Sequence, residues 1–147
     1  MKRTETILST GLPGLDRVLS GLRPGDNVVW VVDQVEDYQP VLEPLAQEAA
    51  RHGRELIYFR FADHPPLFAA RPGIVIHELD PHVGFERFVG ALLDVIEAAG
   101  RGAYYVFDQL SGLAVDWFSD RMLGNFFMIV CPFLYELDTI AYFALQR

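Results

Sequence analysis

The stretch NVVWVVDQVEDYQPV, residues 27–41, predicts how this fold begins. Residues 28–32 are all β-branched or aromatic, which is typical of a strand buried on both faces. Pro40 suits the first turn of a helix. The loop between strand and helix carries three carboxylates: Asp33, Glu36 and Asp37. Strand–loop–helix units of this kind often cradle a phosphate, but carboxylates repel a phosphate, so the loop's chemistry needs another explanation.

Apolar runs typical of strands alternate with segments of helical periodicity along the rest of the chain. Further strands are predicted at residues 55–61, 74–79, 103–108 and 138–145. Helices are predicted at residues 40–52, 83–99 and 119–135, and a short amphipathic segment is formed by Leu15, Val18, Leu19 and Leu22. This alternation predicts an α/β domain with a mainly parallel sheet and helices on both faces.

The length of 147 residues fits one domain, spanning residues 1–147. Because the chain stops directly after its last predicted strand, we expect it to be the N-terminal part of a longer protein. The net charge is −8, from 20 acidic and 12 basic residues, which argues against non-specific nucleic-acid binding. Lys2 is the only lysine, so a mechanism that needs a lysine inside the fold is excluded.

The single cysteine, Cys131, can form no intrachain disulfide, and a reducing, cytoplasmic location fits this composition. The N-terminus lacks the apolar core of a signal peptide. Residues 126–145 are apolar enough to be considered as a membrane span. However, Pro132, Glu136 and Asp138 divide them into a helix and a strand, so we expect no membrane association.

Two segments resemble known motifs of one family. Residues 9–32, STGLPGLDRVLSGLRPGDNVVWVV, resemble the beginning of a RecA-like ATPase domain of the KaiC type. Residues 104–113, YYVFDQLSGL, resemble the Walker B strand of that family, with Asp108 at the acidic position. The resemblance implies a RecA-like fold over most of the chain.

The site residues depart from that family. Its phosphate loop, G-x-x-x-x-G-K-[ST], falls on residues 33–40, DQVEDYQP. Tyr38 stands at the second glycine, Gln39 at the lysine, and Pro40 at the hydroxyl residue that would hold magnesium. Each of the three carboxylates would oppose a phosphate oxygen about 4 Å away by roughly 1 to 4 kcal/mol. The loop is thus a degenerate Walker A motif.

A second departure follows the strand at residues 55–61. KaiC-type domains carry two adjacent glutamates there that activate water, whereas this chain has Ala62 and Asp63. The family's N-terminal motif, which begins at residue 9, is present. The Walker A loop and the pair of glutamates, which form the ATPase site, are both lost. This pattern predicts a fold kept for a purpose other than hydrolysis.

The segments GDNVVW and YFRFADHPP are similar to N-terminal modules of phosphoenolpyruvate synthase or pyruvate, phosphate dikinase-like proteins. That resemblance implies a position ahead of phosphotransferase domains. Together with the decayed ATPase motifs, it predicts a catalytically silent regulatory or assembly domain, without a cofactor, that contacts copies of itself or the adjacent phosphotransferase domains. The alternative is a nucleotide- or phosphometabolite-binding module that holds ATP through a divalent ion. Its site would use the degenerate positions, which are Asp33, Asp37, Tyr38, Gln39, Asp63 and Asp108.

Other polar residues have two interpretations each. The densest group of metal-ligand types is His77, Glu78, Asp80 and His82, but a turn and helix start are favoured because no spacing fits a ligand motif. Asp63 and His64 could form an acid–base pair or a turn. Asp108 could hold magnesium or cap the next helix. Ser111 is interpreted as a loop hydroxyl, since it lacks a nucleophile motif.

Overall fold

The computed structural model describes residues 6–111, 113 and 120–147. These residues form a five-stranded sheet in the order β1-β5-β4-β2-β3, with every neighbouring pair parallel. The strands are β1 (Asn27–Val32), β2 (Leu56–Arg60), β3 (Ile74–Glu78), β4 (Tyr104–Asp108) and β5 (Ile140–Gln146). The helices are α1 (Pro13–Leu19), α2 (Gln39–Arg51), α3 (Phe85–Ala99) and α5 (Asp120–Glu136), with 3-10 turns η1 (Val35–Asp37) and η2 (Pro81–Val83).

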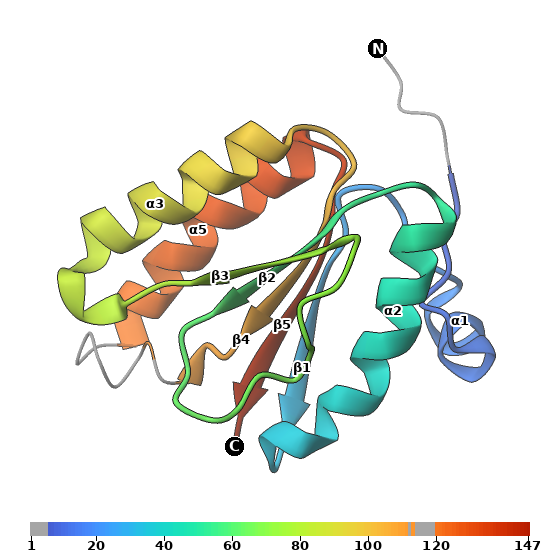
Figure 1. The fold of residues 1–147 in the computed structure, drawn as a ribbon, viewed down its shortest axis with the longest axis horizontal. Coiled ribbons are helices and arrows are strands. Elements are labelled where there is room, and N and C mark those ends of the chain that lie inside the picture. The colour runs from blue at the N-terminus through green and yellow to red at the C-terminus, as the bar shows by residue number, and fades with distance from the viewer. Residues whose placement is uncertain (1–5, 112, 114–119) are drawn as a thin grey trace.

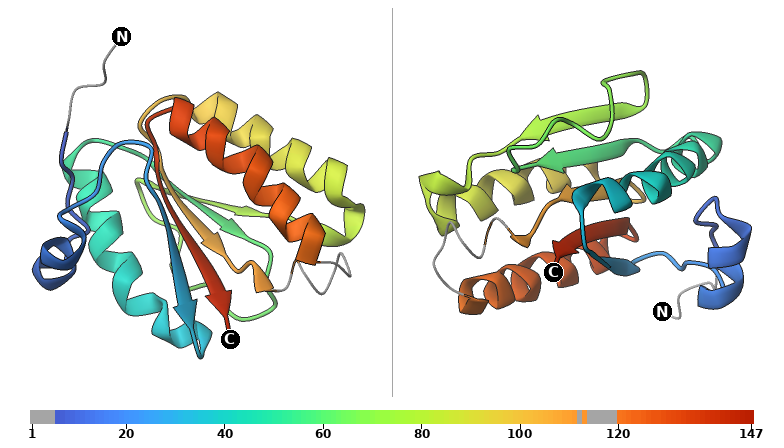
Figure 2. Two further views of the ribbon diagram at one scale, coloured as in Figure 1. Left: turned by 180° about the vertical axis from the view of Figure 1, so that it is seen from behind. Right: turned by 90° about the horizontal axis from the view of Figure 1, so that it is seen from below.

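The sheet lies between two helical layers (Figures 1 and 2). Helix α2 covers one face, and α3 and α5 lie side by side on the other. The predicted α/β class, with a parallel sheet covered on both faces, is therefore confirmed. This architecture is consistent with a Rossmann- or RecA-like fold. Each predicted strand agrees with the structure to within two residues at either end.

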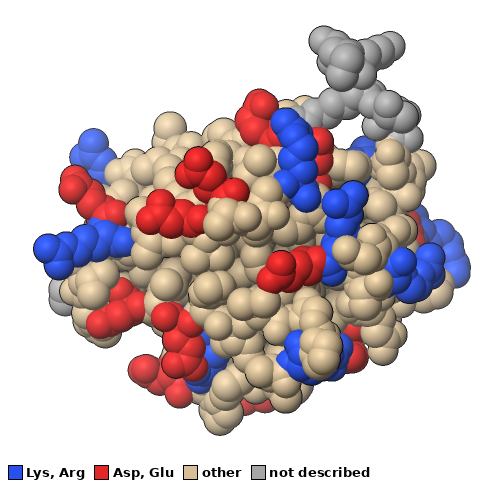
Figure 3. Space-filling view, turned by 45° about the horizontal axis from the view of Figure 1, so that its top comes forward, with Lys and Arg blue, Asp and Glu red and all other residues tan. Residues whose placement is uncertain are grey.

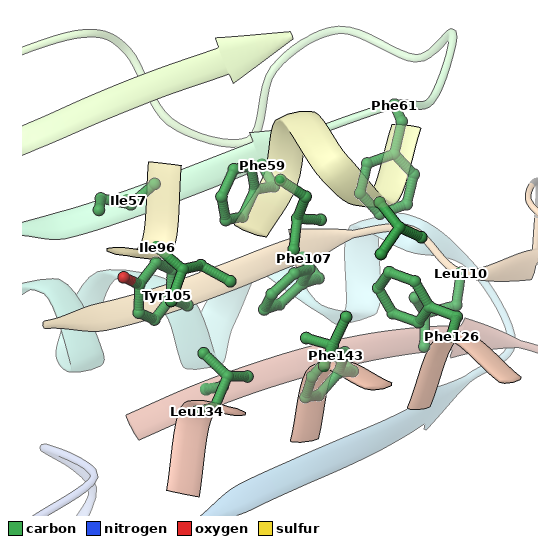
Figure 4. Close-up of a cluster of buried hydrophobic side chains, with 14 of the residues drawn as sticks. Ile57, Phe59, Phe61, Ile96, Tyr105, Phe107, Leu110, Phe126, Leu134 and Phe143 are labelled. Carbon is green, nitrogen blue, oxygen red and sulfur yellow. The ribbon is translucent and has the colours of Figure 1, made fainter. Parts of the chain in front are cut away.

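The core beneath α3 and α5 combines aliphatic side chains with a group of packed aromatic rings (Figure 4). The ring of Phe107 on β4 stacks on that of Phe143 on β5, with centroids 4.4 Å apart and planes 11° from parallel. The edge of Phe126 from α5 meets Phe107 at 6.3 Å. Such ring pairs add to the free energy gained by burial, and they fix how α5 lies on the central strands.

The core beneath α2 contains tyrosines from three strands. Tyr58, Tyr104 and Tyr142 come from β2, β4 and β5, and Tyr38 comes from the chain that enters α2. Trp30 of β1 packs against Tyr142 with ring centroids 5.5 Å apart. This face of the sheet therefore buries phenol groups next to apolar side chains.

Helix α1 differs from its sequence prediction. The spacing of its leucines and Val18 predicted one buried face, but α1 buries none of its residues, and Val18 is 81% exposed. Leu22, beyond the helix end, is the member of that pattern that enters the core. Its backbone is held by Leu8, whose N–H donates to the Leu22 carbonyl at 2.7 Å.

The residues that carry the family resemblance have structural roles at the start of α1. The Asp16 carboxylate accepts hydrogen bonds from the backbone N–H and the hydroxyl of Thr10, at 2.7 and 2.6 Å, and from the hydroxyl of Ser9. Burial opposes ionisation of Asp16, but these hydrogen bonds outweigh it and lower its pKa. The Ser9 hydroxyl also accepts from the Gly11 N–H at 2.9 Å. The motif thus forms a closed turn.

We expect Gly11→Ala to destabilise the fold, while Gly14→Ala does not. Gly11 has a φ of +85°, and an added Cβ would lie 2.5 Å from the Pro44 carbonyl oxygen of α2. The backbone conformation alone costs about 1–2 kcal/mol for a residue other than glycine. Gly14 has open space around it, so alanine there should leave stability unchanged or raise it by up to about 1 kcal/mol. Urea unfolding of both variants tests this, and equal midpoints would contradict it.

Residues 126–145, considered above as a membrane span, form the end of α5 and then β5. Within the described part of the chain, no helix combines the length and apolarity needed to cross a bilayer. Charged side chains of both signs are interspersed over the face shown in Figure 3, and the basic ones do not gather into one patch.

Candidate functional site

A cleft of about 670 Å³ opens at the carboxyl edge of the sheet. Parallel α/β proteins bind ligands at this edge, where loops leave the strands. The cleft lies among the segments that follow β2, β3 and β4 and the end of β5. Its polar lining residues are Arg60, Asp63, His64, Glu78, Asp80, His82, Gln109 and Gln146.

Asp108, the last residue of β4, lies next to this cleft but is fully buried. The Tyr58 hydroxyl donates to Oδ2 of Asp108. Nε2 of His64 lies 2.7 Å from Oδ1 of the same carboxylate. The peptide bond between Asp108 and Gln109 is cis. Both oxygens of the carboxylate therefore have partners within the chain, as a buried carboxylate requires.

His64 joins Asp108 to the loop after β2. Its Nδ1 lies 2.8 Å from the Pro65 carbonyl oxygen, which can only accept a hydrogen bond, so Nδ1 carries a proton. A hydrogen bond between Nε2 of His64 and Oδ1 of Asp108 needs a second proton, which is bound to one of these two atoms. The ring is thus engaged at both nitrogens, and its side chain is 17% exposed.

Two further contacts fasten the same loop. The Leu67 N–H donates to the Tyr58 hydroxyl oxygen at 3.1 Å. Arg60 of β2 donates from Nη2 to the His64 carbonyl and pairs through Nη1 with Glu78 of β3 at 2.6 Å. Burial, and then the charge and hydrogen bond of Asp108, raise the pKa of Tyr58 well above its ordinary value. The loop is therefore tied to β2 and β4 at several points.

The acidic loop after β1 is occupied by contacts within the chain. Asp33 pairs with Arg147, whose Nε lies 2.9 Å from Oδ1, and its carbonyl accepts from the Gln146 amide at 3.1 Å. The Asp37 carboxylate accepts from the Gln34 N–H at 3.2 Å. The N–H groups of Asp37 and Tyr38 donate to Gln34 and Val35 carbonyls, both at 3.0 Å. Three of the backbone donors that a phosphate loop could aim at a ligand, the N–H groups of Gln34, Asp37 and Tyr38, are therefore used locally.

The six degenerate nucleotide positions do not come together in one open site. Tyr38 is fully buried, and burial followed by the charge of Asp108 raises its pKa well above the ordinary value. Gln39 donates from Nε2 to the Leu67 carbonyl at 3.2 Å. Asp63 lines the cleft and is exposed, whereas Asp108 lies beneath the surface.

The group between His77 and His82 has the geometry of a turn. Oδ1 of Asp80 accepts from the backbone N–H of His82 and lies 2.9 Å from its Nδ1, at the start of η2. The hydrogen bond from the His82 backbone is the main cause that lowers the pKa of Asp80. His77 instead packs against the ring of Phe59 at 5.9 Å. Among the described residues, no group of three or more histidine, cysteine or carboxylate side chains is arranged to hold a metal ion.

Ser111, expected to be a loop hydroxyl, binds the end of β5. Its Oγ accepts from the Gln146 N–H at 2.7 Å and donates to the Gln146 carbonyl at 3.3 Å. These two hydrogen bonds hold the segment after β4 beside the end of β5, whose Gln146 also contacts the acidic loop.

Sequence reasoning missed Tyr58 and Arg60 as site residues. Both were interpreted as strand residues, and both are. Arg60 is the last residue of β2, and Tyr58 lies two residues before it. The register of the parallel sheet aligns Arg60 with Asp108 on one side and with Glu78 on the other. A signal was therefore present, because charged residues at the ends of three predicted strands meet at one edge.

Comparison with known proteins adds no assignment. No protein-family model and no curated protein sequence matches the chain.

Proposed function

We propose that this chain is a RecA-like domain of the KaiC type that neither binds nor hydrolyses ATP and acts as a regulatory or assembly module. Its partners would be copies of itself or the adjacent domains of a phosphoenolpyruvate synthase or pyruvate, phosphate dikinase-like protein. The observation that carries the proposal is the environment of Asp108. At the position where the family holds magnesium, the carboxylate is fully buried and bonded to Tyr58 and His64.

The acidic loop supports the same proposal. Magnesium needs carboxylate oxygens with free lone pairs and open space for water. A triphosphate needs backbone donors and positive charge. Here the Asp37 carboxylate binds the backbone of its own loop, and Asp33 already pairs with Arg147. The loop therefore has no lysine or glycine to grip a triphosphate, and two of its three carboxylates are already bonded within the chain.

We expect calorimetric titration with ATP and magnesium to detect no binding, which means a dissociation constant weaker than about 1 mM. The matched titration replaces ATP with magnesium alone and measures any heat from the carboxylates. Micromolar affinity for ATP would overturn the proposal. Measurement of the mass in solution, with and without the neighbouring domains of the parent protein, tests the assembly role. A strict monomer that binds none of them would contradict that role.

The alternative function, a nucleotide- or phosphometabolite-binding module that uses a divalent ion, is favoured by one observation. The cleft has a volume within the ordinary range for small-ligand sites, and Asp63 lines it beside His64. Asp33 and Asp108 would have to give up their present partners to join such a site. Binding in the ATP titration that depends on magnesium and is lost in Asp63→Ala would support this alternative.

A further inference from the structure

The outer edge of β1 is open and uncharged. β1 is an edge strand of the sheet, with β5 as its only neighbour among the described strands (Figure 1). Its six residues, NVVWVV, contain neither a charged side chain nor a proline. Natural edge strands usually carry such residues, because an unprotected edge pairs with other strands.

The ladder with β5 determines which backbone groups face outward. The carbonyls of Asp26 and Val32 accept from Ala141 and Arg147 of the β5 segment, at 3.1 and 2.9 Å. In a parallel ladder, alternate residues point their N–H and C=O groups to the same side. Even-numbered positions of β1 therefore face β5, and the N–H and C=O groups of Asn27, Val29 and Val31 point away from the sheet.

The apolar side chains at this edge are exposed as well. Val29 is 45% exposed and Val31 is 53% exposed. Both lie on the face of the sheet whose central strands are covered by α5. On α5, Met128 and Tyr135 are seven residues apart, which places them on one side of the helix. Met128 is 76% exposed, and the Tyr135 ring lies against Gly25, just before β1 begins. Strand edge and helix side thus form one apolar surface, the β1 surface, made of Val29, Val31, Met128 and Tyr135.

We propose that the β1 surface binds a second copy of this chain, with the two β1 strands antiparallel across a twofold axis at Val29. This rests on the proposed assembly function and names its surface. The axis sets Val29 opposite Val29 of the second copy and Asn27 opposite Val31 of the second copy. These are the residues whose backbone groups point outward, so each pair exchanges two hydrogen bonds. The two sheets become one continuous sheet, and a twofold contact closes at two copies.

Charge favours this direction over a parallel one. One end of β1 adjoins Arg23 and Asp26, whose charges offset one another, and the other end leads into the acidic loop, where three carboxylates outnumber Arg147. Antiparallel pairing brings the Arg23 end of each copy to the acidic end of the other, whereas a parallel contact would set like ends together. Among the described residues, the Glu36 carboxylate has no hydrogen-bond or ion-pair partner, so it is available to a cation from outside the chain. The opposite edge strand, β3, carries Glu78 and His77 and is less suited to self-pairing.

The test is the mass in solution of the 147-residue chain by analytical ultracentrifugation, up to about 1 mM protein. We expect a reversible dimer of twice the 16.6 kDa chain mass. Val29→Lys should abolish it, because two ammonium groups would meet on the axis. Val75→Lys is the matched control, since Val75 is an exposed valine of the other edge strand, and its dimer should persist. Circular dichroism verifies that both variants fold.

Hydrogen exchange gives a second readout that needs no variant. The amides of Asn27, Val29 and Val31 should exchange more slowly in concentrated than in dilute protein. A chain that stays monomeric at every concentration would overturn the proposed dimer. A dimer that survives Val29→Lys, or is lost in Val75→Lys, would also overturn it. A monomer that still binds no ATP would leave the silent-domain proposal standing, with neighbouring domains as its partners, so the two failures are distinguishable.

Discussion

Replacing Asp108 with alanine should lower the free energy of unfolding by about 2–5 kcal/mol, because it leaves two hydrogen-bonding partners in the chain without their acceptor, at about 1–3 kcal/mol each. The side chain is fully buried and binds both Tyr58 and His64. The variant leaves the Tyr58 hydroxyl and the His64 ring without their acceptor in a place that water reaches poorly. The loop that follows β2 loses its attachment to β4 at the same time.

Urea unfolding followed by circular dichroism measures this change, and Asp63→Ala is the matched control. Asp63 is an exposed aspartate of the same cleft, so its removal should change stability by less than about 0.5 kcal/mol. Asp108→Asn keeps an acceptor for one of the two partners and should fall between the two. Equal stabilities of the Asp108→Ala variant and the original chain would contradict the structural role.

This measurement also separates the two proposed functions. A carboxylate that is kept unpaired to bind a metal ion commonly destabilises the folded protein. Its removal then leaves the free energy of unfolding unchanged or raises it. A carboxylate that closes a loop gives the opposite result. The sign of the change in Asp108→Ala therefore reports whether the Walker B-like position serves a cation or the fold.

The strands were predictable from sequence because each is a short apolar run bounded by glycine, proline or acidic residues. The parallel sheet followed from the alternation of strands and helices. Helix α1 was predicted less well. Periodicity indicated which residues share a side, but it could not indicate that this side would remain uncovered, as the exposure of Val18 shows.

The partners of Asp108 were not predictable from local pattern. His64 and Tyr58 lie 44 and 50 positions from it in the chain. Sequence analysis considered His64 only with its neighbour Asp63, as an acid–base pair or a turn, whereas in the structure His64 contacts Asp108. The contact depends on how the proline-rich loop after β2 folds back over β4, and this path is set by distant contacts such as that of Leu67 with Tyr58. What the parallel register does bring together is the ends of β2 and β4, so that Arg60 lies beside Asp108.

The free energy of unfolding should fall steeply as the pH rises above about 10. Burial is the main cause that raises the pKa of five tyrosines above the ordinary value of 10.0, and these are Tyr38, Tyr58, Tyr104, Tyr105 and Tyr142. Nearby carboxylates add to the shift, Asp108 for Tyr38 and Tyr58. Because the folded pKa is higher than the unfolded one, this contribution to stability is complete below about pH 10. It declines as the pH rises towards the folded values.

The size of the effect follows from proton counting. Each tyrosine that ionises only in the unfolded state removes up to about 1.4 kcal/mol per pH unit. Tyr38, Tyr58, Tyr105 and Tyr142 have the largest increases in pKa, and together they remove on the order of 4 kcal/mol between about pH 10 and 11. That loss is a large part of the stability of a small domain. Urea midpoints at a series of pH values should fall steeply above about pH 10, and tyrosinate absorbance should appear together with the loss of circular dichroism.

Tyr105→Phe provides the matched control for this prediction. The Tyr105 hydroxyl is buried and has no hydrogen-bond partner among the residues that the structure describes, so phenylalanine should fit at neutral pH with little loss of stability. Because one tyrosine fewer ionises on unfolding, the slope of stability against pH should become shallower by about 1.4 kcal/mol per unit. Tyr58→Phe should reduce the slope equally but also cost stability at neutral pH, because it removes the hydrogen bond to Asp108. Tyrosines that ionise near pH 10 while the chain stays folded would show that water reaches the phenols on both faces of the sheet and that the cores are looser than their packing indicates.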